Sequence, residues 1–258
     1  IFDLLEHPYV QRLRRIRQLG LTSFVYPGAT HTRFQHALGA VHLMGQAIDN
    51  LRQKGTEIPD AEAEGVTAAI LLHDIGHGPF SHALEESMIS DVNHEILSVM
   101  LIDSLNREFG GRLTLALDIF NNRYEKKFLH QLVSGQLDMD RMDYLMRDSF
   151  YAGVVEGNIG TERIIKMLKV AGDQLVVEAK GIYSIEKFLI ARRLMYWQVY
   201  FHKTVIAAEN LLVKVLQRAR QLAEHDPSLP ATPALAYFLR NSVTAANIES
   251  QREETLEA

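Results

Sequence analysis

Apolar residues recur at three- and four-residue steps along most of the chain, as they do on the buried face of an amphipathic helix. The first clear run begins near His36 and comprises Ala37, Ala40, Val41, Met44, Ile48 and Leu51. Gly55 is placed to end this helix, and Gly76 and Pro79 break a second helix, rich in alanine and leucine, over 61–73. The same steps predict further helices at 94–108, 125–134, 140–148 and 159–171. The chain is therefore predicted to be mainly α-helical.

One short stretch departs from this pattern. Residues 174–179 form a β-branched run followed by Lys180 and Gly181, which predicts a turn into a second strand and a small hairpin over 174–183. We therefore expect an all-α fold with this one hairpin.

The rest of the chain is again predicted to be helical. From Ser184 to about Leu222 apolar residues occupy more than one side of a long helix, as expected for a helix buried in the domain or at a subunit contact. A loop marked by Pro227, Pro230 and Pro233 precedes a last helix. We expect one domain over 1–223 and a helical extension over 224–258 that is truncated, because the chain ends within a charged helical pattern without a closing cap.

Composition limits the available chemistry. The 258 residues are 47% hydrophobic, enough to bury a substantial core, and include no cysteine, so any metal ligands are His, Asp or Glu. No apolar run approaches the roughly 20 residues that span a bilayer, and no charged-then-apolar leader opens the chain. We expect a cytoplasmic protein that does not contact membranes.

The charge balance bears on the possible partners. A formal net charge of -5 argues against a surface that coats nucleic acid generally, and no specific nucleic-acid binding is predicted. Arg12, Arg14, Arg15 and Arg17 cluster early in the chain, and we interpret them as solvated side chains or ion-pair partners.

The segment over 73–82 carries the chemistry, since it places three imidazoles and a carboxylate within ten residues. His73 and Asp74 are adjacent and cannot share one face of a regular helix, but a helix end broken by Gly76 lets both converge on one ion. A divalent cation offsets the desolvation that otherwise opposes burying these groups together. A metal site is therefore predicted here.

Two ligands rarely hold a metal, and two other places offer more. His36 opens the first long helix, and Asp138, Asp140 and Asp143 stand at turn or helical spacing. Each has an ordinary alternative, because a single His is most often packed or hydrogen-bonded, and Asp140 and Asp143 could be an N-cap and an exposed acid.

These residues lie within a longer series of motifs. The chain resembles the HD superfamily, named for its His-Asp doublet, and within it the dNTP triphosphohydrolases, from about Phe2 to about Lys203. The matching stretches are His7-Pro8, Gln11-Arg12-Leu13-Arg14, Gln18-Leu19-Gly20, Pro27-Gly28-Ala29, His31, Arg33-Phe34, His36 and the whole of 73–82.

The resemblance assigns roles to individual residues. It implies one divalent metal ion held by His36, His73, Asp74 and Asp140, with Asp138 as a nearby supporting acid. It implies roles in the catalytic pocket for His77, His82, Glu85 and His94, although family members commonly carry Asp where this chain has Glu85. It implies sugar recognition by Gln18, Leu19, Tyr144, Asp148 and Tyr200, and phosphate recognition by Arg33, Arg141 and Arg192. Without the resemblance, these eight recognition residues would be interpreted as surface ion pairs and core aromatics.

The implied reaction is hydrolysis of a deoxynucleoside triphosphate to a deoxynucleoside and triphosphate by a homo-oligomer. The ligand types leave the metal open among Mn, Fe, Mg, Co, Ni and Zn. Two alternatives remain: a phosphohydrolase of nucleoside monophosphates, cyclic dinucleotides or guanosine tetraphosphate, and a nucleotide-binding protein without turnover. The Gly-Tyr-Pro signature of the cyclic-diguanylate branch is absent from the chain.

Overall fold

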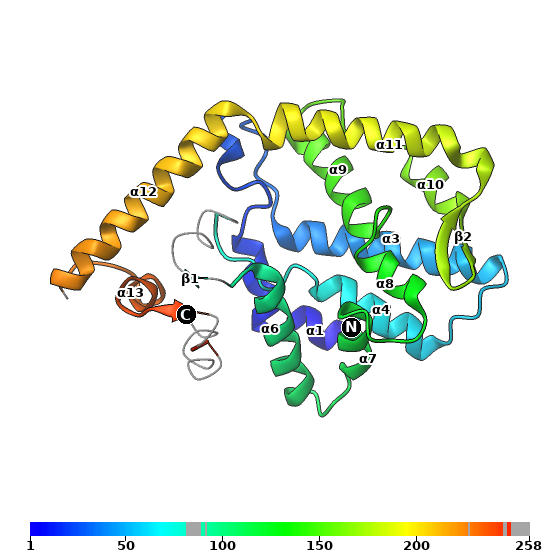
Figure 1. Ribbon diagram of the computed structural model, residues 1–258, viewed down its shortest axis with the longest axis horizontal. Helices are drawn as coiled ribbons and strands as arrows, with labels where there is room; N and C mark the ends of the chain where they lie inside the picture. The colour runs from blue at the N-terminus through cyan, green and yellow to red at the C-terminus, as the bar shows by residue number, and fades with distance from the viewer. Residues whose placement is uncertain (81–88, 91, 227, 245–246, 249–258) are drawn as a thin grey trace.

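Helix α3 (Arg33–Gln53) runs through the middle of the molecule, and its start is set by local hydrogen bonds (Figure 1). Thr32 and Gln35 form a capping box, in which each side chain accepts a hydrogen bond from the other residue's backbone amide. The helix therefore begins at Arg33, slightly earlier than predicted. The computed structural model describes residues 1–80, 89–90, 92–226, 228–244 and 247–248.

Two helices pack against α3 and carry the other residues of interest. Helix α4 (Asp60–Leu72) begins after Pro59 with two acids in its first turn, and helix α9 (Met139–Ala152) is capped by Asp138 and ends at Gly153, whose φ is +71°. Figure 1 shows α9 between α3 and a long helix, α11 (Ile182–Met195). The ends of α4 and α9 are thus brought to the start of α3.

Shorter elements surround this centre. The N-terminal segment forms α1 (Phe2–Glu6), α2 (Pro8–Gln11), η1 (Arg12–Arg15) and η2 (Gly20–Phe24). The remaining elements of the bundle are α6 (His94–Glu108), α7 (Thr114–Phe120), α8 (Lys127–Val133), α10 (Thr161–Met167) and η3 (Ala179–Gly181). A short parallel pair joins β1 (Ile89–Ser90) to β4 (Val243–Thr244). The mainly α-helical prediction is confirmed, and among the described helices none combines the length and apolar character needed to cross a bilayer.

The hairpin exists, but its partner strand was predicted on the wrong side. Strand β3 (Gln174–Val177) pairs antiparallel with β2 (Leu168–Ala171), which precedes it and which the sequence pattern had placed in a helix. The turn consists of Gly172 and Asp173, with φ of +57° and +61°, as required for a two-residue hairpin turn. The predicted turn at Lys180 and Gly181 is instead part of η3.

The long helix predicted from Ser184 to Leu222 is two helices. Helix α11 ends in a π-helical turn, η4 (Tyr196–Tyr200), and α12 (Lys203–His225) starts after a break at which His202 caps the new helix by accepting from the Thr204 amide. Side chains hold the break, since Tyr26 donates to the Gln198 carbonyl at 2.9 Å. In Figure 1, α12 therefore departs from the line of α11.

The last predicted helix is confirmed as α13 (Pro233–Arg240), which packs on α12 through a small apolar cluster of Leu216, Ala223 and Leu239. A much larger core cluster lies under α3, α4, α8 and α9, and includes the fully buried Met44, Leu72 and Leu129. The division of the chain at 223 and 224 stays a prediction.

Candidate metal centre

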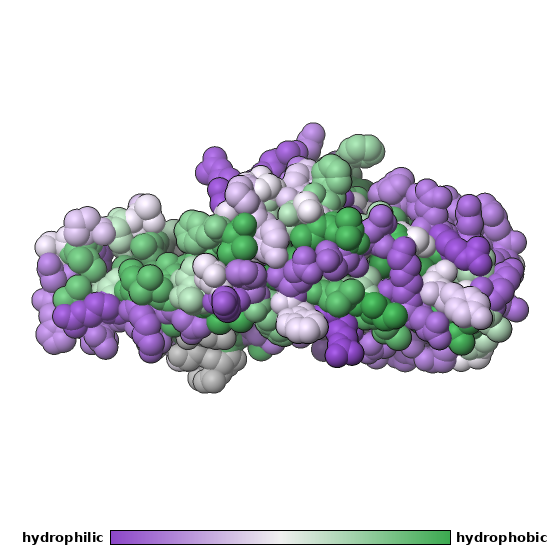
Figure 2. Space-filling view, turned by 90° about the horizontal axis from the view of Figure 1, so that it is seen from above, coloured by the Kyte–Doolittle hydropathy of each residue, from purple (hydrophilic) through white to green (hydrophobic). Residues whose placement is uncertain are grey.

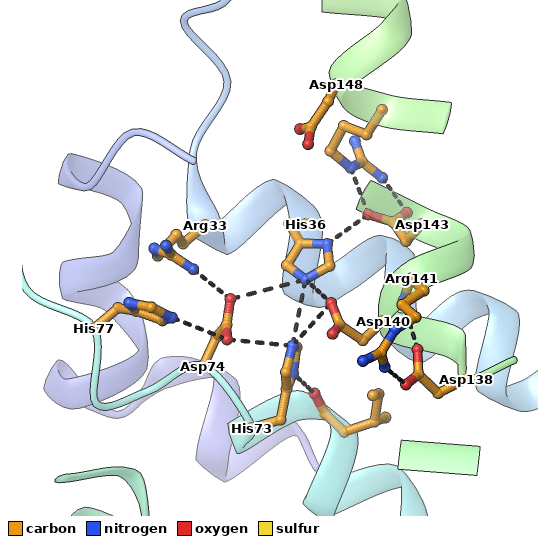
Figure 3. Close-up of polar contacts among 12 residues, drawn as sticks. Arg33, His36, His73, Asp74, His77, Asp138, Asp140, Arg141, Asp143 and Asp148 are labelled. Carbon is orange, nitrogen blue, oxygen red and sulfur yellow. Dashed lines mark hydrogen bonds and ion pairs between the residues drawn. The ribbon is translucent and has the colours of Figure 1, made fainter. Parts of the chain in front are cut away.

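Two imidazoles and two carboxylates from three helices meet at one point (Figure 3). The Nε2 atoms of His36 and His73 are 3.3 Å apart. Asp140 Oδ1 lies 3.1 Å from His36 Nε2 and 3.5 Å from His73 Nε2. Asp74 Oδ1 is 3.5 Å from His73 Nε2, and Asp74 Oδ2 is 3.9 Å from His36 Nε2. His36, His73 and Asp74 thus offer ligand atoms that all lie within 4.8 Å of one another, and the fourth predicted ligand, Asp140, lies beside the two histidines.

Both histidines present Nε2 to this point because their other ring nitrogen has a partner. His36 Nδ1 donates to Asp143 Oδ2 at 2.8 Å, and His73 Nδ1 donates to the Ile70 carbonyl at 2.6 Å. A bond at Nδ1 fixes both the orientation of an imidazole and the nitrogen that offers a lone pair. The arrangement therefore aims two nitrogen lone pairs at the same place.

The His-Asp turn is held from two sides. Ser98 of α6 accepts from the Gly76 amide and donates to the His73 carbonyl, both at 2.9 Å. A Cβ on Gly76 would lie 2.3 Å from the His94 carbonyl oxygen, so only glycine allows α6 to approach so closely.

Arg12 holds the other side of the turn by donating to the His77 carbonyl at 2.9 Å and to the Ile75 carbonyl. The interpretation of Arg12 as a solvated or ion-paired residue was therefore wrong. Burial, followed by the charge of Arg33, lowers its pKa to about 10. The signal was hidden because a hydrogen bond to a distant backbone carbonyl leaves no pattern in the sequence.

Asp74 is surrounded by positive and donor groups. Arg33 donates to its Oδ2, and His77 Nε2 lies 3.4 Å from its Oδ1. The rings of His77 and His94 stack at 3.8 Å between centroids. Figure 3 shows Arg33 and His77 on the side of Asp74 away from Asp140, so the basic groups line one side of the centre.

Within the protein alone, these charges stabilise one another. Burial lowers the pKa of His36, but hydrogen bonds to Asp140 and Asp143 outweigh burial and raise this pKa to about 10. Burial raises the pKa of Asp74, but the charges of His73 and Arg33 bring it well below its ordinary value. The positive charge of the protonated imidazoles thus offsets the negative charge of the buried carboxylates. A bound divalent cation would supply positive charge at the same place.

The donor set fits a cation. Ligand atoms bonded to one metal at about 2.1 Å lie roughly 3.0–3.5 Å from one another. The Nε2 atoms of His36 and His73 lie 3.1 to 3.9 Å from each other and from the carboxylate oxygens of Asp74 and Asp140. Nitrogen and carboxylate oxygen are ligands of borderline and hard divalent metals. The site has the composition and spacing of a metal centre, in which Asp143 and the Ile70 carbonyl orient the two histidines.

Comparisons with known proteins agree with this geometry. The HD domain family matches residues 33–148, from Arg33 at the start of α3 to Asp148 on α9, and the HD associated region matches 159–231. The chain belongs to the HD superfamily. The resemblance inferred from the motifs is thereby confirmed.

Individual relatives place the chain within this superfamily. It is 60% identical to a phosphohydrolase of Bacteroides thetaiotaomicron of known structure, which superposes with a TM-score of 0.96 over 99% of this chain and 63% of that chain. It is 39% identical to the uncharacterized protein YwfO of Bacillus subtilis, over 92% of this chain and 56% of that protein. It is 31% identical to the deoxynucleoside triphosphate triphosphohydrolase SAMHD1 homolog of Dictyostelium discoideum, over 100% of this chain and 53% of that protein. The chain thus spans just over half the length of these two curated relatives and lies near the dNTP triphosphohydrolase branch.

Three residues predicted to contact the sugar of a nucleotide lie together, two from the HD domain and one from the HD associated region. Tyr200 donates to Asp148 Oδ2 at 2.9 Å, and the rings of Tyr200 and Tyr144 are 6.1 Å apart. Tyr144 also lies edge-on to His36, with ring centroids at 6.5 Å. A continuous set of side chains thus leads from the metal centre to Asp148.

The other predicted recognition residues lie at the edges of this set. Gln18 and Leu19 precede η2, and Arg192 of α11 stands over the ring of Tyr196 at 5.6 Å. Burial raises the pKa of Tyr144, and the charge of Arg192 offsets part of this rise. Arg141 pairs with Asp138, whose pKa rises to about 6 through burial and the charge of Asp140.

Two of the predicted catalytic residues lie outside the described residues, namely His82 and Glu85. His94 opens α6 as predicted. The roles that the resemblance implies for His82 and Glu85 in the catalytic pocket therefore stay predictions.

Two polar residues of the centre were not given their observed roles by the sequence analysis. Asp143 is not an exposed acid, because its side chain is 8% exposed and holds His36, and the N-cap of α9 is Asp138 rather than Asp140. His31 is 2% exposed and donates from Nε2 to Asp148 Oδ1 at 2.6 Å. The four-residue spacing of Asp143 and Arg147 could have indicated that Asp143 is ion-paired rather than exposed. His31 stood in a motif that matches the family, but no role was assigned to it.

Proposed function

We propose that this chain is the catalytic part of a metal-dependent phosphohydrolase that cleaves deoxynucleoside triphosphates to a deoxynucleoside and triphosphate. The observation that carries the proposal is the convergence of His36, His73, Asp74 and Asp140 on one point beside Arg33. Two relatives support the chemistry by name, one a phosphohydrolase and one a deoxynucleoside triphosphate triphosphohydrolase.

A bound divalent cation would act as a Lewis acid on a phosphate oxygen and lower the pKa of a coordinated water. The chain supplies the rest. In this proposal Arg33 and Arg141 offset negative charge on phosphates, for which the guanidinium fork is well suited. His77, between Asp74 and His94, can hold a proton near the reacting phosphate. We further propose that His82 is the general acid for the sugar 5′-oxygen and that Glu85 and His94 orient the attacking water.

Substrate recognition rests on buried polar atoms that lack a protein partner among the described residues. These atoms are Gln18 Oε1, Arg141 Nε and His31 Nδ1. Buried polar atoms are normally satisfied, so a group of them beside a candidate site indicates a polar ligand. A phosphate fits Arg141, while a sugar hydroxyl fits Gln18 and Asp148. Tyr144 and Tyr200 pack edge to face, and we propose that they leave no room for a 2′-hydroxyl.

Product analysis tests this function. The protein is incubated with Mn²⁺ in separate reactions that each contain one class of nucleotide: dNTPs, NTPs, nucleoside monophosphates or cyclic dinucleotides. The products are then separated by chromatography. We expect triphosphate and deoxynucleoside from dNTPs, and a loss of at least 100-fold in rate for Asp74→Ala with the fold retained by circular dichroism. Phosphate release from another nucleotide alone would reassign the substrate, and Mn²⁺ binding without any hydrolysis would favour a sensor.

We also propose that the chain forms a homo-oligomer. Figure 2 shows apolar side chains among charged ones on the face made by α11 and α12. Along α11, η4 and α12, the apolar side chains of Leu189, Trp197, Leu211 and Val215 are between 52% and 75% exposed. Exposed apolar side chains of this size commonly mark contact surfaces. Light scattering after size exclusion should give a mass above that of one chain, and a monomer at micromolar concentration would contradict this part of the proposal.

A further inference from the structure

Helix α3 contains a glycine at a position where nothing in the backbone demands one. Gly39 follows His36 by three residues, in the interior of a 21-residue helix, and its φ is not among the positive values found elsewhere in the chain. Glycine in such a position costs about 1 kcal/mol of helix stability relative to alanine. The reason for Gly39 therefore has to be sought in its neighbours.

Those neighbours are the two side chains behind His36. A Cβ on Gly39 would lie 1.9 Å from Asp143 Oδ1 and 2.1 Å from Arg147 Nη2, far inside contact distance. Asp143 and Arg147 form a two-pronged ion pair, with Arg147 Nε 2.8 Å from Oδ2 and Arg147 Nη2 2.9 Å from Oδ1. The missing Cβ leaves the space that this ion pair occupies.

The ion pair acts on His36 through a single atom. Asp143 Oδ2 accepts from both Arg147 Nε and His36 Nδ1, each at 2.8 Å. With Asp143 fixed by two bonds from Arg147, the His36 ring is held at Nδ1, and Nε2 faces His73, Asp74 and Asp140 (Figure 3). Partners of this kind, which touch a ligand rather than the metal, typically change metal affinity by about 10–100-fold when they are lost.

We propose that Asp143, Arg147 and Gly39 form one positioning unit that fixes the orientation and tautomer of His36 and thereby sets the affinity of the centre for its cation. The inference rests on the proposed function only in that His36 binds a cation. It assigns a ligand-orienting role to an ion pair whose helical spacing alone indicates an ordinary surface bridge.

The decisive experiment compares two glycines of the same helix. Gly39→Ala places a Cβ against the ends of two flexible side chains, so the backbone is expected to fold while Asp143 and Arg147 move away from His36. Gly45→Ala is the matched control, because a Cβ on Gly45 would meet no atom within 4 Å. Mn²⁺ affinity is measured by isothermal titration calorimetry, and the visible absorption of bound Co²⁺ reports the coordination geometry.

We expect Gly39→Ala to bind Mn²⁺ about 10–100-fold more weakly and to change the Co²⁺ spectrum, while Gly45→Ala leaves both unchanged. Asp143→Asn, which keeps the side-chain shape but loses the charge that holds Arg147, should weaken binding in the same direction and serves if Gly39→Ala does not fold. Asp103→Asn controls for loss of an Asp-Arg pair at the same spacing on another helix, the pair of Asp103 with Arg107.

Two results overturn the inference in different ways. Unchanged Mn²⁺ affinity and Co²⁺ spectrum in folded Gly39→Ala and Asp143→Asn would show that His36 needs no support from this unit, while the metal centre stands. Absence of Mn²⁺ and Co²⁺ binding by the unaltered protein would overturn both this inference and the proposed function.

Discussion

At the scale of single residues, the centre is governed by an imidazole enclosed by acids. His36 has no exposed side-chain surface and lies within 3.9 Å of carboxylate oxygens of Asp74, Asp140 and Asp143. Burial alone favours a neutral ring, but hydrogen bonds to two carboxylates outweigh burial and raise the pKa to about 10. In the absence of a cation, His36 is therefore protonated at neutral pH, and a cation bound at Nε2 would displace that proton.

This gives a stability prediction with a definite sign. The pKa of His36 is about 10 in the folded protein and near 6.5 in the unfolded chain, so its contribution to stability is complete below about pH 6.5 and is lost as the pH rises toward 10. In EDTA, the urea concentration at the unfolding midpoint should decrease as the pH is raised from 7 to 9.5. The decrease should be smaller in His36→Gln. A midpoint that is flat over this range, or equal slopes for the two proteins, would contradict the assignment.

At the scale of elements, the helices follow from the sequence wherever an apolar period meets a local start signal. Helix α6 begins at His94 as predicted, with Asn93 accepting from the Ile96 amide. The β2 strand was missed because Ile164, Ile165 and Leu168 continue a helical period, and only pairing with β3 decides its conformation. The break between α11 and α12 was missed for a similar reason, because the π-helical turn before it is held by hydrogen bonds between residues far apart in the sequence. Tyr26 donates to the Gln198 carbonyl, and Tyr200 donates to Asp148.

The hairpin turn offers a prediction at this scale. Asp173 adopts a left-handed φ and accepts from the Lys127 amide at 2.9 Å, so it both shapes the turn and ties it to the start of α8. Asp173→Ala should lower the free energy of unfolding by about 1–2 kcal/mol, because alanine tolerates this conformation poorly and cannot accept that bond. Asp173→Asn keeps both properties and should lose less than half as much. Equal losses for the two variants in urea unfolding would contradict this account.

At the scale of the whole molecule, the site depends on how α3, α4 and α9 are rotated relative to one another. The sequence identifies the His-Asp doublet because three imidazoles and an acid are unusually dense there. Residue spacing does not separate Asp140 from Asp143, which are one helical turn apart on α9, and only the family resemblance selected Asp140 as a ligand. In the folded chain Asp140 faces Nε2 of His36 while Asp143 faces Nδ1. Only the packing of α9 against α3 decides which carboxylate faces Nε2 of His36, where a cation is proposed to bind, and which faces Nδ1.

Because the four candidate ligands come from segments far apart in the chain, a cation bound by all of them should stabilise the whole domain. A ligand that binds only the folded state at 100 times its dissociation constant adds about 2.7 kcal/mol, which for a chain of this size corresponds to a rise in Tm of roughly 5–10 °C. Scanning calorimetry with Mn²⁺ and with EDTA should show this rise in the unaltered protein. It should be lost in His36→Gln and in Asp140→Ala alike, since each removes a contact between α3 and α9 through the cation. If Asp140→Ala keeps the full rise while His36→Gln loses it, the cation is held without α9, and Asp140 is not a ligand.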